Sequence, residues 1–230
     1  MHAEELAKTI DHTLLTANAT AEDVERFCRE AAEYHFAAVC IFPYYVPQAH
    51  GLLKDADVKV CSVISFPFGA DTPRAKMVAA EDAVANGADE IDVMINLPAL
   101  LSGQFGAVRD DLASVVRAAR MRSVNTGRGH VTVKAIIETC YLTAPLKKLA
   151  CKICEHAGVD FVKTSTGCGP KGATAQDVEL LRDCLGEYIG VKASGGIRTV
   201  RDVELMINAG AARIGTSAGV AIVREALAAT

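Results

Sequence analysis

Charged side chains inside apolar runs are the feature of this sequence that first points to chemistry. The runs VKAIIET, FVKTST and GVKAS contain Lys134, Lys163 and Lys192, and the run EIDVMI contains Asp92. Burying an unpaired charge in such a run is costly, so each charge needs a partner or a function. Two lysines with an aspartate nearby favour a reactive site over a set of structural ion pairs.

Two neighbouring lysines suggest amine chemistry on a carbonyl group. A free lysine has a pKa of about 10.4 and is protonated at neutral pH, whereas only the neutral amine attacks a carbonyl carbon. Loss of hydration and a second ammonium group nearby both lower the pKa of a lysine. If adjacent strands carry Lys163 and Lys192, one can be the nucleophile while the other remains the cationic neighbour and proton carrier.

Three short loops rich in glycine, serine and threonine predict a phosphate site. They read TSTGCGPKG at 164–172, ASGGIRT at 193–199 and GTSAG at 215–219. Such loops offer backbone N–H groups, hydroxyl groups and the N-terminus of the following helix to a phosphate dianion. A single glycine loop would be an ordinary turn, but three that converge predict a phosphorylated small-molecule substrate.

The elements that must position these residues alternate along the whole chain. β-branched runs predict strands at 8–14, 38–42, 59–64, 90–95, 131–137, 161–164, 190–193 and 213–215. Helical patterns occur at 21–35, 44–54, 73–86, 105–122, 144–156, 175–185, 200–208 and 219–227. The expected N-caps are Thr20, Thr72, Thr143, Thr174 and Thr199, and the glycines at or near helix exits are Gly51, Gly87, Gly158 and Gly210. This alternation is typical of a parallel sheet wrapped by helices.

Eight predicted strands and eight predicted helices favour a closed barrel over an open sheet. The Gly-x-Gly-x-x-Gly motif that opens the first helix of many open sheets is missing. We therefore expect one α/β domain, residues 1–230, with the (β/α)₈ TIM-barrel fold. The active site of such a barrel lies at the carboxyl ends of its strands. That end should gather Asp11 of the first strand, Asp92 of the fourth, Lys134 and Glu138 of the fifth, Lys163 of the sixth and Lys192 of the seventh.

Composition argues against several classes of function. The 230 residues are half hydrophobic and carry a formal net charge of −4 without a basic stripe, so we expect no nucleic-acid partner. The chain has no run of about 18 apolar residues and no stretch resembling a secretory signal, so we expect no membrane association and a cytoplasmic location. Its eight cysteines are scattered, and we interpret them as reduced thiols, including the helical C-x-x-C of Cys151 and Cys154.

At these motifs the sequence resembles the deoxyribose-phosphate aldolases, a family of class I aldolases. The resemblance covers nearly the whole chain and rests on IDHTLL, VCIFPYYVP, GADEIDVMIN, VKAIIETCYL, FVKTSTG, VKASGGIRT and RIGTS. It implies reversible cleavage of 2-deoxy-D-ribose 5-phosphate to D-glyceraldehyde 3-phosphate and acetaldehyde, in deoxyribonucleotide catabolism and without a cofactor or metal. It also implies a homodimer or a higher homo-oligomer.

The resemblance further implies roles for individual residues. Lys163 would form the Schiff base, Lys192 would tune it and share in proton transfer, and Asp92 would act through a water in the proton relay. The expected substrate-binding residues are Asp11, Thr13, Thr166, Gly167, Gly195, Gly196, Arg198, Gly215 and Ser217. After FVKTSTG the chain continues C-G-P-K-G, which leaves open whether Cys168 or Lys171 contacts the phosphate.

Other functions fit part of the pattern. A different Schiff-base barrel enzyme, acting on a ketose phosphate or a transaldolase-type donor, would need the same kind of lysine. A non-catalytic sugar-phosphate-binding barrel would keep the phosphate loops but has no reason to keep Asp92, Lys163 and Lys192 together. A metal-dependent aldolase would need several histidines at strand ends. His12 alone stands in such a position, so we expect no metal site.

Overall fold

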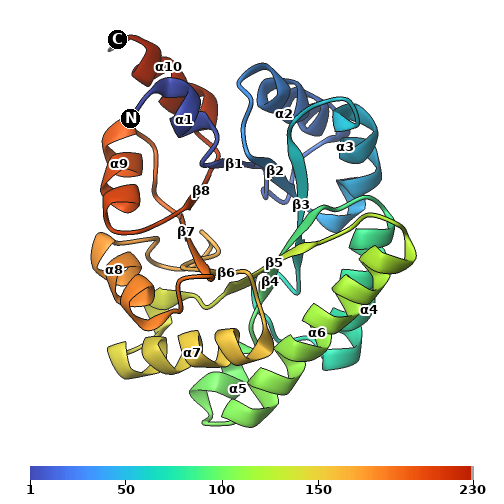
Figure 1. Ribbon diagram of the computed structural model, residues 1–230, viewed down its shortest axis with the longest axis vertical. Coiled ribbons are helices and arrows are strands. Elements are labelled where there is room, and N and C mark those ends of the chain that lie inside the picture. Colours follow the sequence, from blue (N-terminus) through green and yellow to red (C-terminus); the bar gives the residue numbers. More distant parts are fainter. Residues whose placement is uncertain (229–230) are drawn as a thin grey trace.

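Eight parallel strands close into a barrel in this protein (Figure 1). The computed structural model describes residues 1–228, and β8 pairs with β1 to close the ring. The strands are β1 (Ile10–Thr13), β2 (Ala38–Ile41), β3 (Lys59–Ile64), β4 (Glu90–Met94), β5 (Thr132–Ile136), β6 (Phe161–Lys163), β7 (Gly190–Ser194) and β8 (Arg213–Thr216). The expected (β/α)₈ TIM barrel is confirmed.

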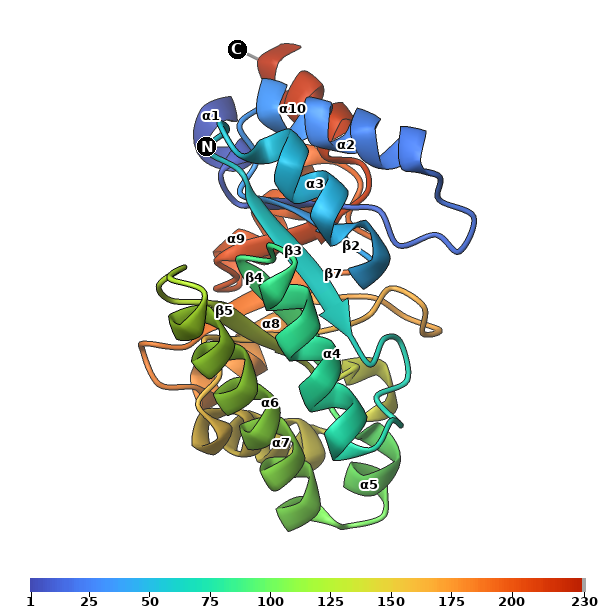
Figure 2. The same ribbon diagram turned by 90° about the vertical axis from the view of Figure 1, so that its right-hand side faces the viewer.

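Helices follow the strands and surround the barrel, as Figures 1 and 2 show from two sides. Those expected from the sequence are α2 (Ala21–Glu33), α3 (Val46–Leu53), α4 (Pro73–Ala85), α6 (Phe105–Asn125), α7 (Ala144–Ala157), α8 (Ala175–Cys184), α9 (Val200–Asn208) and α10 (Gly219–Ala228). The sequence pattern does not predict α1 (Ala3–Ala7), α5 (Leu97–Leu101) or the 3₁₀ turns η1 (Pro43–Tyr45) and η2 (Thr139–Tyr141). These elements are too short for a helical repeat of apolar positions to emerge. None of the described helices has the length and apolar composition to cross a membrane.

Threonine side chains fix where several helices begin. Thr20, Thr72, Thr174 and Thr199 each accept a hydrogen bond from the backbone N–H three residues further on, at 3.1–3.3 Å. These bonds satisfy N–H groups that have no partner inside the helix. Thr143 occupies the N-cap position of α7 but makes no such bond. The predicted helix starts are therefore correct, although one of them lacks its hydroxyl cap.

Glycines mark three of the four expected helix exits. Gly158 ends α7 with φ +82°, and Gly87 and Gly210, which follow α4 and α9, also have positive φ angles. Glycine adopts a positive φ angle more readily than other residues because it has no Cβ atom. Gly51, in contrast, lies inside the last turn of α3, near the end of that helix at Leu53.

Apolar side chains pack in two separate regions. The larger lies between the barrel and the helices and includes side chains such as Val39, Ile91 and Val133. The smaller lies inside the barrel, on the sector of β2 and β3, and consists of Ala38, Cys40, Cys61 and Val63. The other strands turn charged side chains inward, and these form the candidate site.

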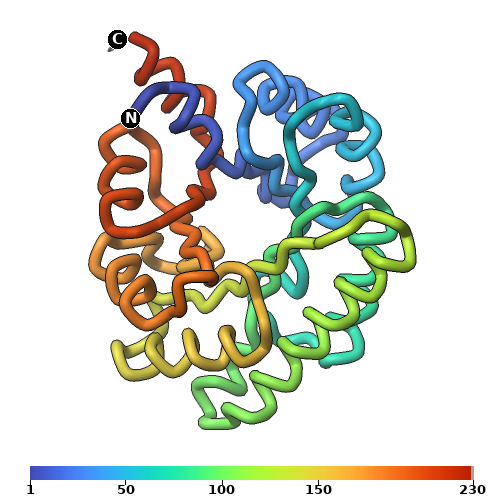
Figure 3. Tube along the Cα trace, in the orientation of Figure 1, coloured from blue at the N-terminus to red at the C-terminus, as the bar shows by residue number. Residues whose placement is uncertain are grey.

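Barrel closure brings the two ends of the described chain together. α1 contacts α10, and Figure 3 shows the blue N-terminal and red C-terminal segments side by side. The register that joins them pairs Asp11 of β1 with Gly215 of β8. A residue near the start of the chain thereby becomes a neighbour of strands near its end.

Candidate active site

Strand alternation turns a set of charged side chains toward the barrel axis. On β4, Ile91 faces the helices, whereas Glu90 and Asp92 face inward. Strands β6 and β7 follow the same pattern in register, since Lys163 is the Cα partner of Lys192. The inward-facing charged residues are Asp11, Glu90, Asp92, Lys134, Lys163, Lys192 and Arg213.

Asp92 is the shared partner of three lysines. Its Oδ2 atom lies 2.7 Å from Lys163 Nζ and 2.6 Å from Lys192 Nζ. Its Oδ1 atom lies 3.0 Å from Lys134 Nζ and accepts a hydrogen bond from the Cys61 thiol at 3.2 Å. Burial would raise the pKa of Asp92, but the three ammonium charges outweigh it and hold that pKa well below its ordinary value of 3.8. Asp92 is therefore an anion at neutral pH.

Lys192 remains a cation. Its Nζ atom contacts the carboxylates of both Asp11 and Asp92, and its side chain has no exposed surface. Burial would lower the pKa of Lys192, but the two carboxylates raise it above its ordinary value of 10.5. Asp11 is likewise held as an anion. Burial would raise its pKa, but the charges of Lys192 and Arg213 keep that pKa below its ordinary value of 3.8. Lys192 is therefore a permanent cation on the strand next to Lys163, and the amines of both lysines contact Asp92 Oδ2.

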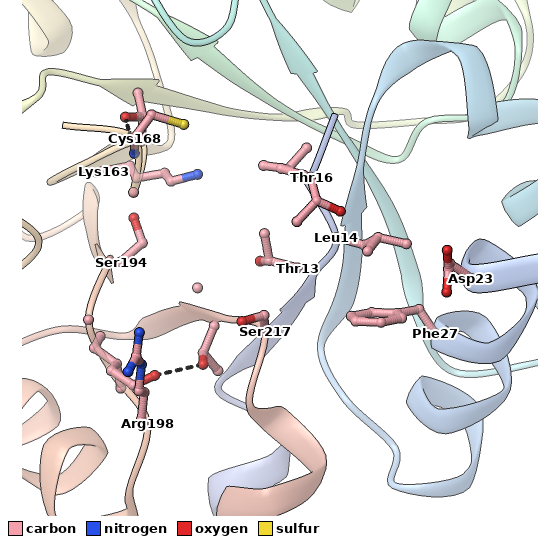
Figure 4. Close-up of a pocket in the computed structure, with 18 of the residues that line it drawn as sticks. Thr13, Leu14, Thr16, Asp23, Phe27, Lys163, Cys168, Ser194, Arg198 and Ser217 are labelled. Carbon is pink, nitrogen blue, oxygen red and sulfur yellow. Dashed lines mark hydrogen bonds between the residues drawn. The ribbon is translucent and has the colours of Figure 1, made fainter. Parts of the chain in front are cut away.

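Lys163 differs from the other inward-facing lysines of the described chain because it reaches a cavity. The cavity has a volume of ≈ 590 Å³ and is lined by Lys163, but not by Lys134 or Lys192. Figure 4 shows the Lys163 side chain pointing into the open space across from Thr13 and Thr16. A molecule in this cavity can therefore approach the amine of Lys163, whereas the other two amines lie beneath the surface.

The described barrel interior holds three carboxylates and three permanent cations besides Lys163. Burial would lower the pKa of Lys134, but Asp92, Cys61 and Glu90 raise it well above 10.5, so this lysine is a fixed cation as well. The other fixed cations are Lys192 and Arg213, and the carboxylates are Asp11, Glu90 and Asp92.

The loops after β6, β7 and β8 form one wall of the cavity. The predicted substrate-binding residues on this wall are Thr166, Gly167, Gly195, Gly196, Arg198, Gly215 and Ser217. Within the described residues, the Arg198 guanidinium has no carboxylate partner; only its backbone N–H is bonded, to Asp202. Figure 4 shows Arg198 and Ser217 in the lower part of the cavity and Lys163 in its upper part. The cavity thus offers an unpaired cation and loop N–H groups at some distance from the amine.

Close backbone contacts explain the glycines of this wall. A Cβ atom on Gly172 would lie 2.1 Å from the carbonyl oxygen of Gly195, and Gly195 itself has φ +90°. A Cβ atom on Gly215 would lie 2.9 Å from Ser194 Cβ and 3.2 Å from Lys192 Cε. Glycine therefore allows two loops to touch and lets β8 approach the side chain of Lys192.

Comparison with known proteins identifies the family. A model of the DeoC/LacD family of aldolases matches residues 6–229. The chain belongs to this aldolase family. The deoxyribose-phosphate aldolase of Thermoanaerobacter sp. (strain X514) is 52% identical over 220 residues, which cover 96% of each chain. That of Caldanaerobacter subterraneus subsp. tengcongensis is 53% identical over 220 residues, covering 96% of this chain and 93% of the relative.

A solved structure supports the same assignment. The deoxyribose phosphate aldolase of Aeropyrum pernix, described as having a unique tetrameric structure, superimposes with a TM-score of 0.89. It is 36% identical, and the match covers 99% of this chain and 93% of that one. The family and the barrel fold therefore agree over nearly the full length.

In this aldolase, most of the site residues predicted from the sequence line the cavity, and three lie beneath it. Asp11, Asp92 and Lys192 are not among the lining residues and lie in the interior network that contacts Lys163. Of the two residues left open for the phosphate, Cys168 lines the cavity, whereas the exposed Lys171 does not. The predicted residues that line it are Thr13, Lys163, Thr166, Gly167, Gly195, Gly196, Arg198, Gly215 and Ser217.

Glu138 does not lie in the fifth strand, contrary to the sequence-based expectation. β5 ends at Ile136, and Glu138 follows with a φ angle of 51°. Its carboxylate accepts hydrogen bonds from the backbone N–H of Thr166, at 3.2 Å, and from the Thr166 hydroxyl. The chain turns after the strand, so this acid is buried beside the loop that follows Lys163 rather than among the lysines.

Sequence reasoning missed Glu90 and Arg213, which complete the interior network. Arg213 Nη2 lies 3.0 Å from Glu90 Oε2 and also contacts Asp11. Strand alternation could have found both, because each lies two residues before an inward-facing position, Asp92 or Gly215. The reasoning also missed the lining residues between β1 and the first turns of α2: Leu14, Leu15, Thr16, Asn18, Asp23, Arg26 and Phe27.

Two groups of buried side chains have ligand atoms close enough to share a metal ion. Within the described residues they are Cys40, Cys61 and Asp92, and Asp11, Cys61 and Glu90. His12 belongs to neither group. Its Nε2 atom lies 2.8 Å from Glu30, and its ring stacks on Phe27. The histidine considered from the sequence is thus part of a packing contact with α2.

Proposed function

We propose that this protein is a deoxyribose-phosphate aldolase that acts through a Schiff base on Lys163. In the cleavage direction it converts 2-deoxy-D-ribose 5-phosphate to D-glyceraldehyde 3-phosphate and acetaldehyde. The substrate is supported by the names of relatives that are 52% and 53% identical over almost the whole chain. The chemistry is supported by the arrangement of amines and carboxylates around Lys163.

One observation carries the assignment of the nucleophile. Lys163 lines the cavity and also shares the Oδ2 atom of Asp92 with Lys192, at 2.7 Å and 2.6 Å respectively. An attacking amine needs both an approach for the carbonyl carbon and a group that takes its proton. Lys134 and Lys192 have acidic partners but no surface in the cavity.

Formation of the Schiff base is the first part of the proposed mechanism. The neutral amine of Lys163 attacks C1 of the open-chain aldehyde and forms a carbinolamine. Lys192, held as a cation by Asp11 and Asp92, provides a proton to the hydroxyl group that leaves as water. The product is a protonated imine, which can accept an electron pair from the neighbouring C2–C3 bond.

Carbon–carbon cleavage follows. We assign removal of the C3 hydroxyl proton to Asp92 acting through a water, which forms the aldehyde group of glyceraldehyde 3-phosphate as the C2–C3 bond breaks. The bond's electron pair becomes the double bond of an enamine on Lys163. Protonation of C2 and hydrolysis then release acetaldehyde and regenerate the amine. The reversed steps make the aldol product.

The phosphate group fits the wall formed by the loops after β6, β7 and β8. Arg198 offers the charge, and the glycines offer N–H groups without side chains in the way. A cytoplasmic location, one folding domain for the whole chain and assembly into a homo-oligomer belong to the same proposal. They are supported by the eight free cysteines and by the tetrameric Aeropyrum pernix relative.

Trapping of the imine tests the proposal. The protein is incubated with acetaldehyde and sodium borohydride, which reduces an imine to a stable secondary amine, and its peptides are then mapped by mass spectrometry. We expect an ethyl group on Lys163 and none on that peptide from the Lys163→Ala variant. An adduct on Lys134 or Lys192, or no adduct at all, would contradict the assignment.

Turnover assays then separate this activity from related ones. We expect formation of 2-deoxyribose 5-phosphate from acetaldehyde and glyceraldehyde 3-phosphate. Activity only with dihydroxyacetone phosphate in place of acetaldehyde would indicate a ketose-phosphate aldolase. Binding of the sugar phosphate without turnover would indicate a non-catalytic sensor.

A further inference from the structure

Two buried thiols face each other inside the barrel. Cys40 of β2 and Cys61 of β3 are Cα partners on adjacent strands, and neither has exposed surface. Their Sγ atoms and a carboxylate oxygen of Asp92 all lie within 4.8 Å of one another. Neither thiol has a role in the proposed aldol reaction, so the pair requires a separate explanation.

Two sulfur ligands and one oxygen ligand are a donor set for a thiophilic divalent cation. Zn²⁺ binds cysteine sulfur at about 2.3 Å in tetrahedral geometry, which sets two thiolates on one ion roughly 3.8 Å apart. The Sγ atoms of Cys40 and Cys61 lie within 4.8 Å of each other, which is close to this separation. Three protein ligands leave the fourth position for water or another small ligand.

The Cys61 sulfur already has a hydrogen-bond donor beside it. Lys134 Nζ donates to Cys61 Sγ at 3.4 Å, the kind of outer-shell hydrogen bond that orients a metal-bound thiolate. A divalent cation that binds here displaces two thiol protons. Because those two protons leave, the net charge of the interior does not change, even though four basic side chains lie nearby.

The second group of ligand atoms is a poorer site. Asp11 and Glu90 are both bonded to Arg213, whose guanidinium does not lose its proton. An ion between them would have to displace that permanent cation. In the first group the basic partners of the carboxylate are Lys134, Lys163 and Lys192, and each reaches Asp92 through a single Nζ atom that can move away on a flexible side chain.

We propose that Cys40, Cys61 and Asp92 form an inhibitory site for a thiophilic divalent cation such as Cd²⁺ or Zn²⁺. An ion on Asp92 takes the carboxylate away from Lys163 and Lys192, so inhibition follows from binding. This second part rests on the proposed function, whereas binding does not. The pair is covered by Leu15, Phe42 and Phe66, and Leu15 also lines the cavity. We therefore expect slow entry from the cavity side, which bound substrate hinders.

Spectroscopic titration tests the site independently of activity. The reduced full-length protein is titrated with Cd²⁺, and the ultraviolet charge-transfer absorption of cadmium–thiolate bonds is followed. We expect one tight equivalent per chain in the native protein. The absorption should be lost in Cys40→Ala and in Cys61→Ala, with folding of each variant checked by circular dichroism. Cys40→Ser and Cys61→Ser provide alternatives of similar volume if either alanine variant fails to fold.

Two control variants address the rival binding sites. Cys151 and Cys154 lie in a C-x-x-C on α7, and Cys168 is exposed in the cavity wall. The absorption should persist in Cys151→Ala/Cys154→Ala and in Cys168→Ala. If it persists in the Cys40 and Cys61 variants and disappears in either control, the ion binds elsewhere and the proposal is wrong.

Activity measurements complete the test. Turnover of the native enzyme should be roughly 100-fold lower with Cd²⁺ than without it. This factor is the lower end of what a positioned acid–base group contributes. In the Cys61 variants, turnover should be nearly the same with and without Cd²⁺. In Cys168→Ala, Cd²⁺ should lower turnover as much as in the native enzyme. Full turnover in the presence of the bound ion would overturn the inhibitory role. Absence of all aldolase activity alongside tight cadmium binding would instead count against the proposed function alone.

Discussion

Two regions of this protein bury lysine ammonium groups in different ways. Between α4 and α6, Lys76 Nζ lies 2.7 Å from Asp111 and 3.1 Å from the carbonyl oxygen of Met94, with 0% and 4% of the two side chains exposed. Inside the barrel, several lysines share Asp92, and Lys163 opens to a cavity. Burial and pairing alone therefore mark a structural lysine as readily as a reactive one. The shared carboxylate and the opening to a cavity distinguish Lys163, the proposed nucleophile, from Lys76.

The largest effect should come from removing the nucleophile. Lys163→Ala should lower turnover by at least roughly 10⁴-fold, because covalent catalysis is lost with the amine. The structural pair provides the matched control. Lys76→Met/Asp111→Leu replaces a buried ion pair with apolar side chains of similar volume, a change that is often neutral for stability. Its steady-state turnover should stay within about twofold of native, since uncoupled sites add independently.

The comparison fails if the two variants behave alike. Equal losses of turnover would mean that Lys76 belongs to the reactive network through the end of β4. Urea unfolding of both variants separates this outcome from loss of fold, because a destabilised control changes the midpoint of unfolding before it changes turnover.

Asp92→Asn tests whether the shared carboxylate is what makes the interior reactive. Turnover should fall roughly 10²- to 10⁴-fold, the range for a positioned acid–base group. The amide keeps the shape of the side chain, so borohydride should still trap acetaldehyde on Lys163. Single-turnover trapping and steady-state turnover are measured on the same preparation. A variant that forms no adduct would make Asp92 necessary for imine formation itself, and the proposed division of roles would be wrong.

Much of this comparison could be read from the sequence. Lys163 and Lys192 stand in apolar runs, and counting strands and helices led to the barrel that makes them neighbours. Lys76 lies in a helix and gives no such signal, because a helical lysine at a buried position looks like one on the surface until the packing of α4 against α6 is known. The sequence therefore indicates the lysines that we propose to be reactive more clearly than the structural one.

The missing parts of the site depend on closure of the barrel. Asp11 meets Lys192, 181 positions later, only because β1 pairs with β8. Cys40 lies beside Cys61 because of the register in which β2 pairs with β3. The alternation of side chains along each strand does not determine that register. Glu138 was misplaced because the chain leaves the strand at Ile136 and turns with a positive φ angle. Partners across the barrel and turns after strands are tertiary features, and short patterns do not encode them.

Arg198→Ala separates binding of the phosphate from reactions at the amine. Loss of a charge-assisted contact to a phosphate costs about 1.5–3 kcal/mol, so the KM for 2-deoxyribose 5-phosphate should rise roughly tenfold or more. Turnover of unphosphorylated 2-deoxyribose should not change, because that substrate never engages the cation. An equal loss with both sugars would show that Arg198 acts on the lysine network instead. Steady-state kinetics with the two sugars measures this difference.

The pH dependence of stability tests how firmly the interior charges are held. Asp11 and Asp92 have pKa values below the ordinary 3.8, so their stabilisation is complete above that value and is lost as pH falls through their lowered pKa values. Lys134 and Lys192 have pKa values above 10.5, so theirs is complete below that value and is lost as pH rises through the raised ones. Between about pH 5 and 9 these groups should leave the free energy of unfolding constant. Urea unfolding across this range, with Asp11→Asn as reference, checks the plateau. A steep slope near neutral pH that Asp11→Asn abolishes would contradict the assigned charge states.

The smallest effect concerns a third kind of buried charge. Glu138 contacts no lysine or arginine in the described chain, and its carboxylate is held instead by the N–H and hydroxyl groups of Thr166. In Glu138→Gln the amide oxygen can still accept one of these bonds, so we expect a loss of about 1 kcal/mol in kcat/KM, or roughly fivefold. The loss should appear in KM for the phosphorylated sugar, because Thr166 begins the segment that continues to Gly167 on the cavity wall. Borohydride trapping at Lys163 should proceed at the native rate. A lowered rate of trapping would place Glu138 in the reactive group with Asp92, and the distinction between charges that hold loops and charges that move protons would have to be redrawn.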